Sequence, residues 1–245
     1  MSFLLSKIKQ ISLLLRSIPS WILAFFVASL IAMKLLANKC ISGLQSWLAL
    51  DAGFLFSWVA FAVMDIIVKR FGARAANLVS FVAILFNLFV VSIFFLASKI
   101  PGEWSTGYGP DGIPVPELNA AVNNIFGGSW YVVFGSTTAI VVSTVFNNFM
   151  NVTIGKLFKK DNFGVYAIRS FFSTFLGQFL DNMVFAFIVS IPFFGWSILQ
   201  ATTCSIIAGT AELLCEVIIS PLSYQIVKKW DETEVGNEYL SQYKK

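Results

Sequence analysis

The sequence predicts an all-α membrane protein that crosses the lipid bilayer about six times and keeps both termini in the cytoplasm. Hydrophobic residues make up 57% of the 245 residues and charged residues only 12%, which is about half the charged share of a soluble domain. Six apolar stretches reach the roughly 20 residues that a helix needs to cross the hydrocarbon. The basic residues gather at the ends of these stretches rather than in one patch, so they indicate topology and not nucleic-acid binding.

The predicted spans form one transmembrane domain over residues 19–229, preceded by a cytoplasmic segment (1–18) and followed by a polar cytoplasmic tail (230–245) that is expected to fray. Its one long loop, 99–129, is rich in Gly, Pro and Asn, and we expect it outside the bilayer with a short amphipathic segment near residues 118–126. Short turns are expected at Gly72 and from Ile191 to Gly195. The spans cover approximately 19–37, 52–68, 76–98, 130–155, 165–191 and 195–227.

Orientation follows from the excess of Lys and Arg that cytoplasmic loops carry. With the N-terminus inside, the opposite side of the membrane holds only Lys39 and Lys99. The chain is therefore expected to be a multi-pass protein of the cytoplasmic membrane. The cytoplasmic side would hold thirteen basic residues: Lys7, Lys9, Arg16, Lys69, Arg70, Arg74, Lys156, Lys159, Lys160, Lys228, Lys229, Lys244 and Lys245.

Several classes of chemistry are excluded by residues that the sequence lacks. It contains no His, which excludes a Ser-His-Asp triad, a His proton shuttle and a His-ligated zinc site. It contains no Walker A motif, so the chain cannot use ATP by itself. An intramembrane diaspartyl protease would need two facing aspartates, and no Gly-x-Gly-Asp context surrounds Asp65 or Asp181. We therefore expect no enzymatic activity, no cofactor and no metal.

Ionisable residues inside the predicted spans are the first candidates for function, because each costs about 2.5–3.5 kcal/mol to insert. For Asp65 the alternative is a surface pair with Lys69 one turn later, and for the other acids it is a buried ion pair. Glu212 and Glu216 lie one turn apart, and two such carboxylates cannot both ionise cheaply in the membrane. That suits a ligand contact or a proton-coupling role. The full set comprises Asp65, Asp181, Glu212 and Glu216, with Lys34 and Arg169 as counter-charges.

Three consecutive spans each carry one polar stripe at helical spacing. Lipid cannot satisfy such groups, so the three stripes should converge on a shared interior cavity. The alternative for the Asn and Thr positions is plain hydrogen bonding between helices. The stripes comprise Thr137, Thr144, Asn148 and Asn151 in the fourth span, Thr174, Gly177, Gln178 and Asp181 in the fifth, and Ser205, Gly209, Glu212, Glu216 and Ser220 in the sixth.

Several segments of the sequence resemble the vitamin-uptake-transporter family, whose better-understood members transport queuosine precursors. The resemblance covers residues 25–230, nearly the whole chain. Lys34, Ala52-Gly53, and Asp65-Ile66-Ile67 followed by Phe71-Gly72 fit the family pattern. The chain departs from it at Ser29, Ser57, Val68 and Lys69, and it has Phe71 where the family usually has Tyr before the Gly. The most specific match is the signature Arg-x3-Ser-Thr-x3-Gln-x2-Asp, at Arg169, Ser173, Thr174, Gln178 and Asp181.

The resemblance implies import of a 7-deazaguanine, such as 7-cyano- or 7-aminomethyl-7-deazaguanine, or of a related base. One carboxylate can accept hydrogen bonds from N1–H and the exocyclic amine of such a base, and an amide can donate to its O6. The substrate-binding residues are then expected among Lys34, Asp65, Asn148, Asn151, Arg169, Thr174, Gln178, Asp181, Glu212 and Glu216.

A second hypothesis is that the chain is a substrate-binding subunit that docks onto a separate ATPase module, as in energy-coupling-factor vitamin importers. Ala24, Ala28 and Ala32 favour it, because small residues at spacing four allow close helix packing. The same face would suit packing inside the protein or a homodimer.

Overall fold

The computed structural model describes residues 2–37, 39, 41, 47, 52–127, 130–157 and 162–243. Within these residues the chain is helical apart from turns and one isolated bridge between Tyr108 and Pro114. The predicted all-α class is confirmed. The elements are α1 (Ser2–Ser17), α2 (Ser20–Leu36), α3 (Phe54–Phe71), α4 (Ala73–Ala97), η1 (Ser105–Gly107), α5 (Pro116–Gly127), α6 (Trp130–Lys156), α7 (Phe163–Phe185), η2 (Ala186–Ser190), α8 (Ile191–Phe194), α9 (Ile198–Glu232) and α10 (Asn237–Tyr243).

Each predicted span corresponds to one long helix: α2, α3, α4, α6, α7 and α9 in chain order. Among the described residues, three segments are long and apolar enough to cross a membrane: α4, α7 continued by η2, and α9. The pair α1 and α2, bent by 103°, makes a fourth if it is counted as one broken span. The count falls short of the predicted six partly because α3 carries Asp65, Lys69 and Arg70 within its 18 residues.

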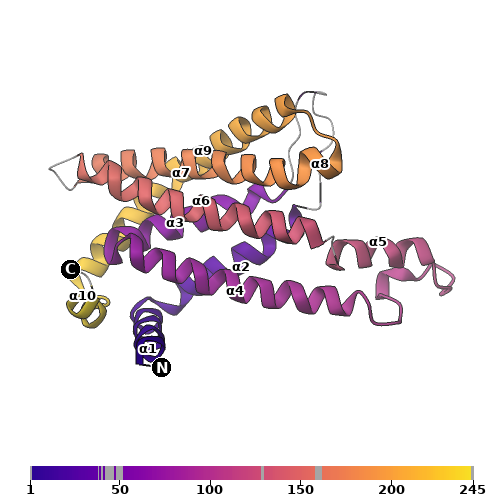
Figure 1. The fold of residues 1–245 in the computed structure, drawn as a ribbon, viewed down its shortest axis with the longest axis horizontal. Coiled ribbons are helices and arrows are strands. Elements are labelled where there is room, and N and C mark those ends of the chain that lie inside the picture. Colours follow the sequence, from indigo (N-terminus) through magenta and orange to yellow (C-terminus); the bar gives the residue numbers. More distant parts are fainter. Residues whose placement is uncertain are drawn as a thin grey trace.

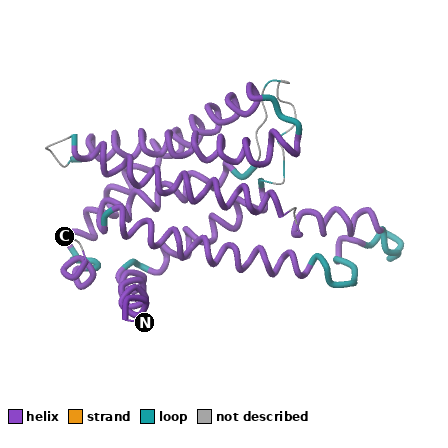
Figure 2. Tube along the Cα trace, in the orientation of Figure 1, coloured by secondary structure: helices purple, strands orange, loops and turns teal. Residues whose placement is uncertain are grey.

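The long helices run roughly along one direction and form an elongated bundle (Figure 1), with the turns gathered at its two ends (Figure 2). The most extensive contacts are those of α7 with α6 and with α9, and α3 packs against α9, α2 and α4. The apolar core includes Phe26 and Leu30 of α2 and Met64 and Ile67 of α3. Polar residues of α3, α6, α7 and α9 therefore share one interior.

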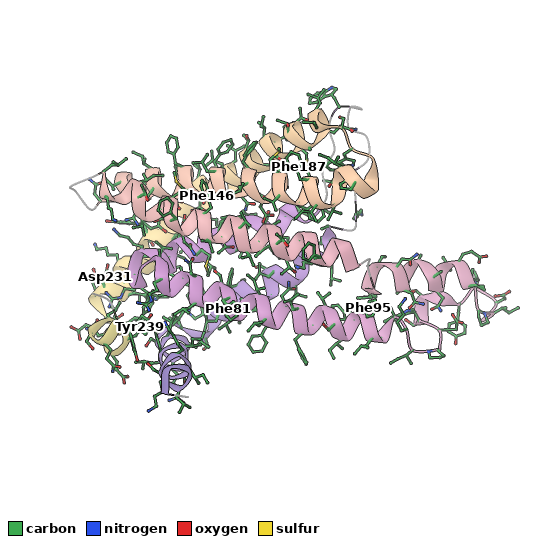
Figure 3. All side chains as sticks on the ribbon, viewed as in Figure 1. Phe81, Phe95, Phe146, Phe187, Asp231 and Tyr239 are labelled. Carbon is green, nitrogen blue, oxygen red and sulfur yellow. The ribbon has the colours of Figure 1, made fainter. Side chains whose placement is uncertain are left out.

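The outer surface of the bundle is apolar. Phe81 and Phe187, on α4 and η2, each expose 55% of their surface (Figure 3). Aromatic and aliphatic side chains of this kind match the hydrocarbon of a bilayer. The distribution is that of a membrane protein, with apolar groups outside and polar groups within.

The two ends of the bundle differ in what they carry. Gly72 ends α3 with φ +88°, a conformation that favours glycine, and α4 begins one residue later. This turn lies at the same end of the bundle as the two described ends of the chain (Figure 1). The C-terminal end of α6 and the N-terminal end of α7 lie at that end too. The opposite end carries the polar segment with η1 and α5, and α5 coincides with the predicted amphipathic segment. The basic residues Lys159, Lys160, Lys244 and Lys245 lie outside the described residues.

The C-terminal tail differs from the expectation that it would fray. Helix α9 continues to Glu232, and α10 folds back so that Tyr239, 2% exposed, meets Phe71 edge to face. Arg70 binds Asp231 at 2.6 Å. The tail is anchored because two of its aromatic side chains, Trp230 and Tyr239, are buried against Phe71 of α3, although most of its other residues are polar.

Candidate functional site

A small polar cavity lies between α2, α3, α6, α7 and α9. Its volume is about 50 Å³, where one water needs at least about 10–15 Å³ by the same measure, so it holds only a few waters. Four of the predicted site residues line it: Lys34, Gln178, Asp181 and Glu212. Ser57, Ser136, Asn182, Phe185 and Cys204 belong to the same wall.

Glu212 is held in this wall by a neighbour on another helix. It is only 2% exposed, and the Ser57 hydroxyl donates a hydrogen bond to its Oε1. Since α3 and α9 are packed together, this bond fixes the carboxylate between them at the cavity surface. The carboxylate is thus oriented by the protein and presented to the cavity.

Asp181 and Lys34 give the cavity one acid and one base on facing helices. Ser143 of α6 donates to Asp181 Oδ1 at 2.7 Å, and Lys34 Nζ donates to Thr137 Oγ1 at 3.0 Å. The two charges are close enough to interact electrostatically. Both side chains therefore have α6 hydroxyls that hold them beside the cavity.

Gln178 contributes an amide whose donor group is not used by any residue in the described part of the chain. The residue is 1% exposed, and its Nε2 has no hydrogen-bond partner among the described residues. The preceding Gly177 lets α7 pack closely at this level, because a Cβ there would come within 2.7 Å of Phe61 and 3.0 Å of Asn147. A buried amide without a partner costs about 1–3 kcal/mol, so a ligand that accepts its hydrogen bond would recover that energy.

A second group of polar residues, which we call the buried network, lies closer to the Gly72 end of the bundle. At its centre Asp65, 1% exposed, accepts from Asn151 Nδ2 at 2.7 Å and from the Ser170 hydroxyl. Ser170 Oγ also lies 2.6 Å from Glu216 Oε1. Thr174 contacts Asp65 Oδ2 at 3.5 Å. The network comprises Asp65, Asn151, Arg169, Ser170, Ser173, Thr174 and Glu216.

Arg169 joins this network through Asn151. Its Nη2 donates to Asn151 Oδ1 at 2.6 Å and its Nε to the Asn151 carbonyl at 3.2 Å. Asn151 in turn donates to Asp65, so one amide links a cation to an anion. Gly155 makes room for the guanidinium, because a Cβ there would lie 2.7 Å from Arg169 Nε.

The structure thus divides the ten predicted site residues into three groups. Four line the cavity, and five (Asp65, Asn151, Arg169, Thr174 and Glu216) belong to the buried network. Asn148 belongs to neither, since its Nδ2 donates to Asn77 of α4 at 2.5 Å. That is the interhelical bonding that was the alternative for the Asn positions. The predicted convergence on one cavity is found only in part: α7 is joined to α6 through Asn151 and to α9 through Glu216, but the polar residues lie in two regions, and α3 contributes to both.

Three hydroxyl residues that orient the acids were not among the site residues expected from the sequence: Ser57, Ser143 and Ser170. Ser170 lies four residues before Thr174 and extends the predicted stripe of α7 by one turn, so helical spacing alone would have found it. Ser143 likewise precedes the buried Asn147 by four residues. Ser57 has no such signal, because its partner Glu212 is on a distant helix.

The cavity and the buried network are separated along the bundle axis. Ser170 and Asp181 lie eleven residues apart on α7, which corresponds to about 16 Å. Asp65 is bonded to Ser170, whereas Asp181 is bonded to Ser143 of α6. The two aspartates therefore do not face each other, as a diaspartyl protease would require.

Comparison with known protein families identifies a match. The model of the family described as "Putative vitamin uptake transporter" matches residues 51–226. This range contains α3 to α7 and most of α9, and with them every residue of the buried network. Searches among curated proteins and among solved structures each found no match. Because the match covers well over half of the chain, the protein belongs to the vitamin uptake transporter family.

Proposed function

We propose that the protein imports a queuosine precursor, a 7-deazaguanine such as 7-cyano- or 7-aminomethyl-7-deazaguanine, or a related base, across the cytoplasmic membrane. The observation that carries this proposal is the combination, in one cavity, of the unpartnered Gln178 Nε2 with the carboxylates of Asp181 and Glu212. A guanine-like edge presents two adjacent donors, N1–H and the exocyclic amine, next to the acceptor O6. The cavity offers the complementary set.

In this proposal Glu212 accepts both donors of the base, because its carboxylate is already oriented by Ser57. Gln178 donates to O6, and Asp181 with Lys34 binds the remaining polar edge or the 7-substituent. Binding residues are therefore Lys34, Gln178, Asp181 and Glu212. A ligand lacking the N1–H and amine donors would leave the buried Glu212 carboxylate without the two hydrogen bonds of the base, which is the strongest form of discrimination such a site offers.

Admission of a bicyclic base requires the cavity wall to move, because about 50 Å³ is too small for it. The wall next to Phe185 continues directly into η2, a π-helical segment, and then into the Gly195 turn. π-helical insertions are weak points in a helix and often occur at functional sites. We assign the opening movement to this part of α7 and η2.

The transport direction depends on topology, and we propose six spans with both termini in the cytoplasm. The thirteen basic residues against two support it, as does the position of α5 at the end of the bundle opposite the Gly72 turn (Figure 1). An Asp111→Cys protein without its native cysteines should react with an impermeant thiol reagent added to intact cells. Protection of that cysteine in intact cells and reaction only after lysis would contradict the topology.

Uptake of labelled 7-cyano-7-deazaguanine into cells that lack their own uptake system tests the function. The parent should accumulate the base, and Asp181→Asn should fold but lose most of this uptake. Glu232→Gln is the matched control, since Glu232 pairs with Lys228 on the surface of α9, where its side chain is 63% exposed. Near-normal uptake by a well-expressed Asp181→Asn protein would remove Asp181 from the proposed site.

The alternative, a binding subunit for an energising ATPase module, is favoured by one observation. Ala24 and Ala28 are exposed on α2 and Ala32 is half-buried, so most of this small-residue face is not used for packing within the described residues. Co-purification with ATPase and coupling subunits would support this alternative. Uptake by the purified chain alone in liposomes would exclude any need for such a module.

A further inference from the structure

Two buried acids of the network share one hydroxyl group. Ser170 Oγ of α7 is hydrogen-bonded both to Asp65 Oδ2 of α3 and to Glu216 Oε1 of α9. Asp65 is 1% exposed, Ser170 1% and Glu216 0%. Bulk water therefore does not screen the two acids. Their hydrogen-bond donors must come from neighbouring protein groups, which can be counted.

A serine hydroxyl has one proton, so it donates one hydrogen bond and accepts the others. If Asp65 and Glu216 were both ionised, Ser170 could donate to only one of them. The other contact would then place two oxygens side by side with no hydrogen between them. Because Ser170 Oγ contacts an oxygen of each acid, both contacts are satisfied when one of the two acids carries a proton and donates it to Ser170.

The surroundings identify Glu216 as the protonated acid. Asp65 accepts from Asn151 as well as from Ser170, and the charge of Arg169 acts on it. Glu216 Oε2, in contrast, has no partner among the described residues. An ionised carboxylate with a bare buried oxygen costs several kcal/mol, while a protonated one does not carry that charge.

The remaining titratable groups near the pair come from the same helices. Tyr166 of α7 and Cys215 of α9 are within electrostatic reach of it. Lys69 follows Asp65 by one turn on α3, and Glu212 precedes Glu216 by one turn on α9. With Glu216 protonated, the single negative charge of Asp65 is balanced by Arg169 through Asn151. The charges of the network and its hydrogen bonds therefore both favour one proton shared by the two acids.

We infer that Asp65, Ser170 and Glu216 form a proton-binding site that is distinct from the cavity and couples import to the proton gradient. The coupling part of this inference rests on the proposed function, whereas the proton site itself does not. Loss of the proton from Glu216 breaks a bond between α7 and α9, the two helices that also carry Gln178, Asp181 and Glu212. Acids buried in a transporter commonly serve as proton relays.

Infrared spectroscopy of the purified protein in liposomes tests the proton site without any transport. At neutral pH the parent should show the carbonyl stretch of a protonated carboxylic acid, with the expected shift in deuterated water. Glu216→Gln should lose this band. Asp65→Asn should lose it too, because Ser170 can then donate to an ionised Glu216. Glu232→Gln should keep it. A band that persists in either network variant, when that variant folds, overturns the site.

Uptake of 7-cyano-7-deazaguanine into the same liposomes tests the coupling. For the parent, an alkaline interior should raise the ratio of uptake to base-for-base exchange, and for Glu216→Gln this ratio should be independent of the gradient. Parent uptake that ignores the gradient overturns the coupling. If the parent shows neither uptake nor exchange, the proposed function has failed, and the infrared result still decides the proton site.

Discussion

Glu212 and Glu216 lie one helical turn apart on α9, and both are almost fully buried, yet they belong to different regions of the molecule. Glu212 borders a small cavity together with a lysine and an unpartnered amide. Glu216 lies in the buried network, where it shares the Ser170 hydroxyl with Asp65. The comparison teaches that one polar stripe can serve two purposes: at the level of Glu212 it borders the cavity, and one turn further along the helix it joins the buried network.

The two regions also differ in how the protein uses the side-chain amide that each contains. In the buried network, Asn151 connects Arg169 to Asp65 with short hydrogen bonds on both sides. In the cavity, the amide donor of Gln178 has no partner among the described residues. We therefore expect changes in the network to affect folding, and changes in the cavity to affect binding.

The largest effect is expected from Asn151→Leu. It leaves the half-buried Arg169 and the buried Asp65 without the amide that joins them, which should lower the free energy of unfolding by about 3–5 kcal/mol. Unfolding by sodium dodecyl sulfate in mixed micelles measures it. Asn148→Leu is the matched control on the same helix, since it removes only a neutral amide pair with Asn77. An equal loss in the two variants would show that Asn151 has no special role.

An intermediate effect is expected from Glu212→Gln. The amide places a donor against the donors of the base, which should weaken binding by about 1–3 kcal/mol, or 5- to 150-fold in affinity. Glu216→Gln should weaken it less, because a protonated carboxyl already resembles an amide. Titration calorimetry of both variants with 7-cyano-7-deazaguanine gives the comparison. Unchanged affinity in both would assign base recognition to α6 and α7 alone.

The smallest effect on stability is expected from Gln178→Leu. Removing a buried donor that has no partner among the described residues should leave the free energy of unfolding unchanged or raise it by up to about 1 kcal/mol. The same change should weaken binding of the base, since O6 loses its donor. A loss of stability comparable to that of Asn151→Leu would place Gln178 in the structural network instead.

Much of this arrangement could be predicted from the sequence. The lengths of the apolar stretches predicted the six long helices, and helical spacing predicted that the polar faces of α6, α7 and α9 point into the bundle. Spacing could not say at which level each acid would lie, because that depends on how far neighbouring helices slide past one another. Asp65 illustrates this: it lies close to the predicted end of its span, where a surface pair with Lys69 was an alternative. Helix α3 continues to Phe71, and its partners on α6 and α7 keep Asp65 buried.

The prediction that the C-terminal tail would fray was wrong for a related reason. Its charges predict a solvated, frayed segment. Trp230 and Tyr239 hold it against the bundle instead, since both are buried against Phe71. The composition of a segment describes all of its residues together, whereas its fold can depend on the few side chains that pack against another helix. The same limit hid Ser57, whose importance follows only from its bond to Glu212.

The central claim, that the base binds in the cavity beside Gln178 and Glu212, can be tested with a residue the cavity already contains. Cys204 lines it and is 5% exposed. In a protein with Cys40 and Cys215 replaced by serine, 7-cyano-7-deazaguanine should slow reaction of Cys204 with a small thiol reagent in proportion to the fraction of protein bound. A protein that keeps only Cys215 serves as the control and should react at an unchanged rate. Reaction of Cys204 at the same rate with and without saturating base would contradict the claim.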